Sequence, residues 1–143
     1  MSIVQFPTDY RKIFTETRTI AVVGMSPKAT RPSHQVTRYM IEHGYEIFPV
    51  NPGQETILGL TCYPDLKAVP VPIDLVDIFR KPNDVPEVVD SAIDIGAKII
   101  WMQQGIVHEA SAAKARGAGL VVVMDRCFKV DHQQLMSERG AFI

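Results

Sequence analysis

Residues 19–33 read TIAVVGMSPKATRPS, an apolar run that passes through Gly24 into a polar loop and then into the start of a helix. The run Thr19–Val23 is rich in Val, Ile and Ala and does not alternate with polar residues. Strands that are buried on both faces have this composition, as in a parallel sheet covered by helices. We therefore expect these residues to form a buried strand of a parallel sheet.

Four further apolar runs have the same character, and helical patterns separate them. The expected strands are Thr19–Val23, Glu46–Val50, Ile73–Phe79, Lys98–Met102 and Leu120–Met124. The expected helices are Asp9–Thr15 capped by Thr8, Ser33–His43, Asp84–Ile95 capped by Asn83, Glu109–Arg116 and Asp131–Arg139. For Gly53–Val71, which breaks this rhythm, we expect a loop with a short turn or helix. The alternation predicts an α/β fold, with a Rossmann-like, doubly wound, mostly parallel five-stranded sheet in three layers.

Length and composition predict one domain over residues 1–143. A chain of 143 residues, 46% of them hydrophobic, can bury a core that needs no disulfide or metal. The formal net charge of −1 argues against a nucleic-acid partner. No apolar run reaches the roughly 18 residues of a membrane span, the first residues lack a signal-peptide pattern, and the two cysteines form no zinc motif. We expect a cytoplasmic protein that does not bind membranes, whose protein partners and oligomeric state stay open.

A polar segment follows each expected strand. Because the carboxyl ends of parallel strands meet at one edge of a sheet, these segments predict a ligand crevice there. The segments are 24–33, 51–53, 79–82, 103–105 and 125–127.

The first of these segments predicts a phosphate ligand. A helix start presents free N–H groups and the positive end of the helix dipole, and both attract anions. No Asp or Glu occurs between Glu16 and Glu42, so the charge of this interval is positive in a nearly neutral chain. Its cations are Arg18, Lys28, Arg31 and Arg38.

The residues after the first two strands favour coenzyme A over NAD or NADP. Ser26 and Ala29 stand where the GxGxxG fingerprint requires glycines. Asn51 stands where an NAD-binding fold places an acidic residue for the ribose hydroxyls. A neutral amide tolerates an extra phosphate on the ribose, which NADP and coenzyme A both carry. No arginine, which NADP would require, occurs from Asn51 to Lys67.

With these residues in view, the sequence resembles the small single-domain coenzyme A-binding proteins of bacteria and archaea, which are related to the CoA-binding domain of the succinyl-CoA ligase alpha chain. The resemblance implies a Rossmann-like, nucleotide-binding domain that binds coenzyme A or an acyl-CoA, often with no known reaction. It extends from about Ile20 to His132 and is carried by the segments AVVG (21–24), RPSH (31–34), PVNP (49–52), ILG (57–59), DIFR (77–80), KIIWMQ (98–103) and MDRC (124–127).

The resemblance also implies which residues hold each part of the ligand. It assigns the pyrophosphate to Gly24, Ser26, Lys28 and Arg31. It assigns the adenosine to Val50, Asn51 and Pro52, and the pantetheine arm to Phe79, Arg80, Gln103 and Gly105. In the family a small residue usually follows Gly24, whereas Met25 stands there in this chain.

We expect a binding module without catalysis of its own, and we assign no catalytic residue and no metal. One alternative is an NAD(P)-dependent oxidoreductase. A second is a thiol-redox or CoA-disulfide sensor built on Cys127, whose thiolate Arg126 and Lys129 would favour. A third is a regulatory or scaffolding subunit that reports acyl-CoA levels to a partner protein. We also expect Trp101 in the core below the crevice and an ion pair between Asp125 and its neighbour Arg126.

Overall fold

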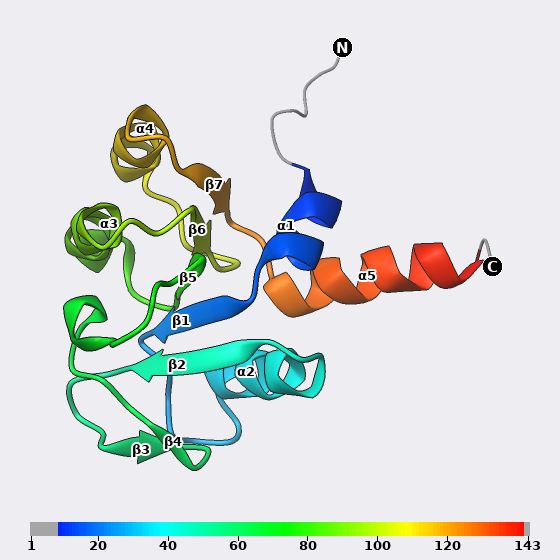
Figure 1. Cartoon of the computed structure of the whole chain (residues 1–143), viewed down its shortest axis with the longest axis horizontal. Helices are drawn as coiled ribbons and strands as arrows, with labels where there is room; N and C mark the ends of the chain where they lie inside the picture. Colours follow the sequence, from blue (N-terminus) through cyan, green and yellow to red (C-terminus); the bar gives the residue numbers. More distant parts are fainter. Residues whose placement is uncertain (1–8, 142–143) are drawn as a thin grey trace.

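A five-stranded parallel sheet forms the centre of the computed structural model, which describes residues 9–141 (Figure 1). The strand order is β2-β1-β5-β6-β7, and every neighbouring pair is parallel. This arrangement confirms the predicted fold class. The strands are β1 (Thr19–Val23), β2 (Glu46–Val50), β5 (Leu75–Ile78), β6 (Ile99–Met102) and β7 (Val121–Met124).

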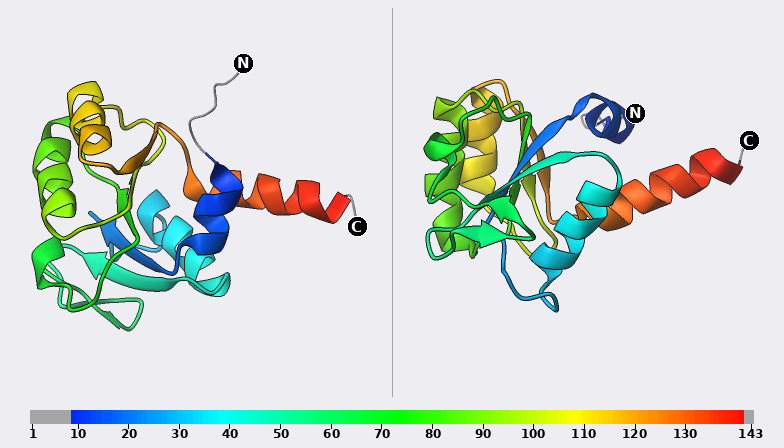
Figure 2. Two further views of the ribbon diagram at one scale, coloured as in Figure 1. Left: turned by 45° about the horizontal axis from the view of Figure 1, so that its top comes forward. Right: turned by 60° about the horizontal axis from the view of Figure 1, so that its bottom comes forward.

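Helices cover both faces of the sheet, so the molecule has three layers (Figure 2). One face carries α1 (Tyr10–Glu16), α2 (Pro32–Glu42) and α5 (Phe128–Ala141). The other face carries α3 (Val85–Asp94) and α4 (Glu109–Gly117). Within residues 9–141, no helix has the length and apolar character that a membrane crossing requires.

The continuous apolar character of the strands follows from this two-sided cover. Successive side chains of a strand point to opposite faces. In β1, Ile20 and Val22 pack under α1, α2 and α5, whereas Ala21 and Val23 pack under α3 and α4. A strand with cover on both sides therefore has no exposed face on which polar residues could alternate.

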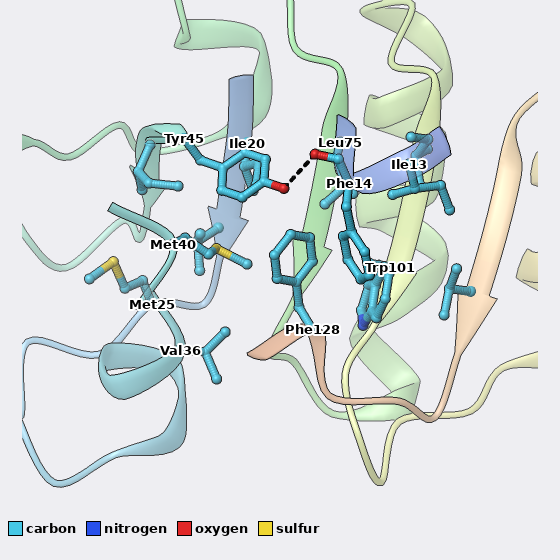
Figure 3. Close-up of a cluster of buried hydrophobic side chains, with 14 of the residues drawn as sticks. Ile13, Phe14, Ile20, Met25, Val36, Met40, Tyr45, Leu75, Trp101 and Phe128 are labelled. Carbon is cyan, nitrogen blue, oxygen red and sulfur yellow. Dashed lines mark hydrogen bonds between the residues drawn. The ribbon is translucent and has the colours of Figure 1, made fainter. Parts of the chain in front are cut away.

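Aromatic residues fill the core below α1 and α5 (Figure 3). Trp101 is fully buried, as predicted, and its ring centroid lies 5.1 Å from that of Phe128. The Tyr45 hydroxyl donates a hydrogen bond of 2.6 Å to the carbonyl oxygen of Phe14, and burial raises the pKa of Tyr45 to about 12. These contacts fix α1 and the start of α5 against the sheet.

Helix α2 begins at Pro32, one residue before its predicted start, and three other helix starts also differ from the sequence prediction. Asp9 caps α1 by accepting a hydrogen bond from the Lys12 N–H, while Thr8 lies outside the described residues. Asn83 does not cap α3, because it lies within a 3-10 turn, η3 (Pro82–Asp84). Helix α5 begins at Phe128 instead of the predicted Asp131, and the Phe128 N–H donates to Oε1 of Gln103 at 3.2 Å. Tertiary packing creates this hydrogen bond, so the sequence around Phe128 does not indicate it.

The interval 53–71 contains more structure than the predicted loop with a short turn or helix. A hairpin pairs β3 (Thr56–Ile57) with β4 (Leu60–Thr61), and a 3-10 turn, η2 (Leu66–Ala68), follows. Leu58 and Gly59, which join the two strands, both have positive φ, as a type I′ turn requires. Strands of two residues carry no readable periodicity, and leucine is unusual at a positive φ, so the sequence did not reveal this hairpin.

Candidate functional site

The strand order reverses between β1 and β5, and two hollows open at the carboxyl edge of the sheet there. In open α/β sheets, ligands bind at such a switch point. One hollow, which we call the cleft, has a volume of about 650 Å³ and lies on the α2 side. The other, the small pocket, has a volume of about 220 Å³ and lies on the α3 side. Arg80, just after β5, borders both hollows.

Most of the predicted site residues line the cleft. Among the described lining residues are four cations, Lys28, Arg31, Arg80 and Lys81, and no Asp or Glu. The described lining of the cleft therefore presents positive charge on several sides. The predicted residues that line the cleft are Gly24, Ser26, Lys28, Arg31, Phe79, Arg80, Gln103 and Gly105.

Two serines shape the loop between β1 and α2. The Ser26 N–H donates to Oγ of Ser33 at 2.9 Å, and the Lys28 N–H donates to Oγ of Ser26 at 3.1 Å. Arg31 occupies the N-cap position of α2 without a side-chain capping bond. The positive end of the α2 dipole therefore meets the cleft without a capping side chain, beside two exposed cations, Lys28 and Arg31.

Gly24 allows the strands to meet closely at the switch point. Its φ is +86°, and its N–H donates to the Val50 carbonyl oxygen at 2.9 Å. A Cβ at this position would collide with the Phe79 carbonyl oxygen and lie 2.7 Å from Cδ of Arg80. The side chain of Met25 is fully buried in the core, so this departure from the usual family residue does not fill the cleft.

Arg80 is held between the two hollows by one ion pair. Its Nη2 donates to Oδ2 of Asp84 at 3.2 Å, across one turn of chain. Both side chains are partly exposed, so the pair orients the guanidinium more than it stabilises the fold. The guanidinium charge therefore lies at the border between the two hollows.

Asn51, a predicted site residue, does not line either hollow. Its Nδ2 donates to the Met25 carbonyl oxygen at 2.9 Å, and its Oδ1 accepts from the Gly53 N–H at 2.9 Å. The side-chain amide thus ties two loops together. Val50 and Pro52, its predicted companions, do line the small pocket.

The opposite end of the cleft is fixed by a residue after β7. Asp125 accepts a hydrogen bond of 2.7 Å from the Gly105 N–H and adopts a positive φ of 61°. The expected Asp125–Arg126 ion pair is wrong, because Arg126 donates two hydrogen bonds of 2.7 Å to Asp131 in the first turn of α5. These hydrogen bonds raise the pKa of Arg126.

Two of the four cations noted in the sequence lie outside the cleft. Arg18 precedes β1 at the other edge of the sheet, and Arg38 lines a separate hollow between α2 and α5. Lys81, a cleft cation that the prediction missed, directly follows Arg80 in the polar segment 79–82. Sequence reasoning could have included it from that adjacency.

The two cysteines have different surroundings. Cys127 is partly exposed and lines the cleft near its Gln103 end. Cys62 is buried, and burial raises the pKa of its thiol. Within residues 9–141, no group of three or more His, Cys, Asp and Glu side chains could hold a metal ion.

One buried carboxyl group lies just below the cleft. Asp77, in the middle of β5, is fully buried, and neither of its carboxyl oxygens has a partner among the described residues. It pairs with Val22 and Trp101 in the sheet, and the residue two positions later, Phe79, lines the cleft on the same face. Burial raises the pKa of Asp77 well above its usual range.

Comparisons with known proteins identify the family of this chain and several similar proteins. A family model described as a CoA binding domain matches residues 18–133. The uncharacterized protein YneT of Bacillus subtilis is 38% identical over 124 residues, which cover 87% of this chain and 92% of that protein. The solved structure of a hypothetical protein from Pyrococcus horikoshii OT3 has a TM-score of 0.86 and 42% identity, and the match covers 88% of this chain and 89% of that one.

A longer enzyme is similar to part of this chain. The ADP-forming acetate–CoA ligase II of Archaeoglobus fulgidus is 32% identical over 92 residues, which cover 63% of this chain. The match spans only 14% of that ligase.

Proposed function

Because this chain belongs to the family of CoA-binding domains, we propose that it binds coenzyme A or an acyl-CoA at the carboxyl edge of its sheet, without catalysis of its own. Family membership supports coenzyme A binding in general. One observation supports this location above all: the cleft at the switch point carries four cations and, among its described lining residues, no carboxylate. Coenzyme A, with its diphosphate, has the charge that such a cleft attracts.

In this proposal the diphosphate lies on the loop between β1 and α2. Lys28 and Arg31 are exposed cations that form no ion pair within residues 9–141. The start of α2 adds its dipole and N–H groups, which favour an anion at this position. Gly24 lets the ligand approach the backbone, because it carries no side chain at the floor of the cleft.

The two ends of the ligand then extend to opposite faces of the sheet. The adenosine lies in the small pocket beside Val50 and Pro52, and Arg80 stands where the two hollows meet. The pantetheine arm follows the cleft past Phe79 toward Gln103 and Gly105.

Titration calorimetry with coenzyme A, dephospho-coenzyme A and NADP tests the proposal. We expect coenzyme A to bind most tightly, because only it combines the pantetheine arm with the extra ribose phosphate. Absence of coenzyme A binding would contradict the proposed function. Tighter binding of NADP would favour the oxidoreductase alternative instead. Equal binding of dephospho-coenzyme A would mean that the protein does not recognise the ribose phosphate.

We expect Arg31→Ala to weaken coenzyme A binding by about 1–3 kcal/mol, because a charged hydrogen bond to a phosphate is lost. This corresponds to a dissociation constant roughly 5- to 150-fold higher. Calorimetry at low and high salt measures the change, and the loss should shrink as salt screens the phosphate. Arg38→Ala is the matched control, since Arg38 is also an exposed arginine but lies within α2 and outside the cleft. Equal affinities of the two variants would show that Arg31 does not contact the ligand.

A further inference from the structure

The two hollows of the site carry opposite charge. The cleft has four cations, whereas the small pocket has two acidic residues, Asp65 and Glu87, with Arg80 at the border between them. The remaining walls of the small pocket are mostly apolar: Val23, Val50, Pro52, Pro64, Leu66 and Val88. Such a pocket suits a flat, uncharged group that donates hydrogen bonds.

Asp65 is held in place at the start of η2. Its Oδ1 accepts a hydrogen bond of 2.9 Å from the Ala68 N–H, and the next residue, Leu66, is buried in the core. Oδ2 forms no hydrogen bond within residues 9–141. One oxygen of this carboxylate therefore fixes the side chain, and the other is available to accept a hydrogen bond at the pocket.

Glu87 belongs to a helix face that forms one wall of the small pocket. It lies in the first turn of α3, and Val88 and Ser91 line the same wall. Helix α3 is anchored by Val85 and Val89, which are fully buried against the sheet. The Glu87 carboxylate forms no ion pair or hydrogen bond within the described part of the chain, so it too can accept from a ligand.

We propose that Asp65 and Glu87 are specificity-determining residues of the small pocket, which select a base that carries an amino group at position 6. This inference rests on the proposed function, in which the pocket holds the adenosine of coenzyme A. A carboxylate can only accept hydrogen bonds, and the 6-amino group of adenine donates them. Hypoxanthine and guanine carry an acceptor oxygen at that position, which a carboxylate repels.

The test compares coenzyme A with an analogue in which hypoxanthine replaces adenine. Both ligands have the same phosphates and the same pantetheine arm, so calorimetry on the full chain isolates the exchanged amino group. We expect the wild-type chain to bind coenzyme A at least about tenfold more tightly, because a site built to accept a hydrogen bond rejects the ligand that lacks the donor. If the two ligands bind equally while coenzyme A binding is intact, the carboxylates do not recognise the amino group of the base. They then contact the ribose hydroxyls or no part of the ligand, and the inference is overturned.

Two isosteric variants assign the effect to residues. We expect Asp65→Asn and Glu87→Gln each to reduce the discrimination at least threefold, because an amide can donate to the oxygen of hypoxanthine as well as accept from adenine. Asp65→Asn retains Oδ1 as the cap of η2. Asp94→Asn is the control: this exposed carboxylate also belongs to α3 but pairs with Lys67 outside the pocket. Discrimination that is unchanged in both pocket variants would overturn the assignment.

Binding of 4′-phosphopantetheine, which lacks the nucleoside, separates this inference from the proposed function. We expect the pocket variants to bind this truncated ligand as the wild type does. If the variants weaken it as much as they weaken coenzyme A, the carboxylates act on the whole cleft and the inference fails. If the wild-type chain binds neither coenzyme A nor the truncated ligand, the proposed function is wrong, and the inference that rests on it is wrong as well.

Discussion

Gly24→Ala is expected to destabilise the chain by about 2–5 kcal/mol and to lower its affinity for coenzyme A at least about tenfold. The backbone at Gly24 has a φ of +86°, where a residue with a Cβ pays roughly 1–2 kcal/mol. The new methyl group would also collide with the Phe79 carbonyl oxygen and approach Cδ of Arg80 to 2.7 Å. Overpacking of this kind costs about 1–3 kcal/mol in a well-packed interior.

The loss of affinity follows from where the collision occurs. Phe79 and Arg80 both line the cleft, and Arg80 also borders the small pocket. A shift of the segment that carries them would displace one cation and the neighbouring wall of the cleft together. Urea unfolding measures the stability, and titration calorimetry with coenzyme A measures the affinity.

Gly96→Ala separates the two causes. Gly96 has a φ of +77°, and a Cβ at this position would meet no atom within 4 Å. It follows α3, at the edge of the sheet opposite the cleft. We expect Gly96→Ala to lose only the stability that the unfavourable backbone conformation costs, and to bind coenzyme A with the affinity of the wild type. If the two variants lose equal stability and both retain affinity, then Gly24 is needed only for its φ and not for the close approach.

Asp77→Asn is expected to make stability less dependent on pH. The Asp77 carboxyl is buried without a partner, and burial raises its pKa well above the usual range, so the folded chain holds a proton that the unfolded chain releases. The unfolded carboxyl titrates near pH 4. Between that pH and the folded pKa, the wild type should lose stability as pH rises, by up to about 1.4 kcal/mol per pH unit from this group. An asparagine takes up no proton, so this slope should be absent in the variant.

The measurement is the difference in unfolding free energy between the two proteins at several pH values from 5 to 8. Taking the difference removes the other titrating groups, and the slope is independent of any constant cost of burying an amide. We expect the unfolding free energy of the variant to increase relative to that of the wild type as pH rises. A difference that stays constant across this range would mean that Asp77 titrates alike in the folded and unfolded chains, and that water reaches its carboxyl group.

Asp74, three residues earlier, provides a control of opposite sign. Burial raises the pKa of Asp74, but hydrogen bonds from the Arg18 and Thr19 N–H groups, together with Lys98, outweigh it and lower the pKa overall. Its carboxylate stabilises the fold above the unfolded pKa, and that contribution is lost as pH falls through the folded pKa. Asp74→Asn should therefore lose stability relative to the wild type near neutral pH and lose less in acid.

The parallel sheet could be predicted from the sequence because burial on two faces leaves a local signature. β1 and β2 match their predicted bounds, and the other three strands lie within theirs. The hairpin β3–β4 could not be predicted, since two-residue strands have no period and Leu58 takes a conformation that its type rarely adopts. The start of α5 was also missed, because Gln103, a residue 25 positions away, binds its first N–H.

The positions of the cleft residues were more accessible to prediction than their contacts. Strand ends in a parallel sheet meet at one edge, so the segments that contain Gly24, Arg80 and Gln103 had to come together. The sequence could not indicate that the Asn51 amide is engaged by Met25 and Gly53, or that Arg126 pairs with Asp131 instead of Asp125.

The sequence by itself determined the fold class and the edge of the sheet that carries the candidate site, because alternation of apolar strands and amphipathic helices is encoded within short windows. Only the tertiary structure decided the shape and charge of the two hollows, since Asp65 and Glu87 reach the same pocket from separate segments. It also left the carboxyl of Asp77 without a partner. Hydrogen bonds and the distribution of charge around a hollow depend on distances of a few ångströms between segments remote in sequence. The packing of the whole chain sets those distances.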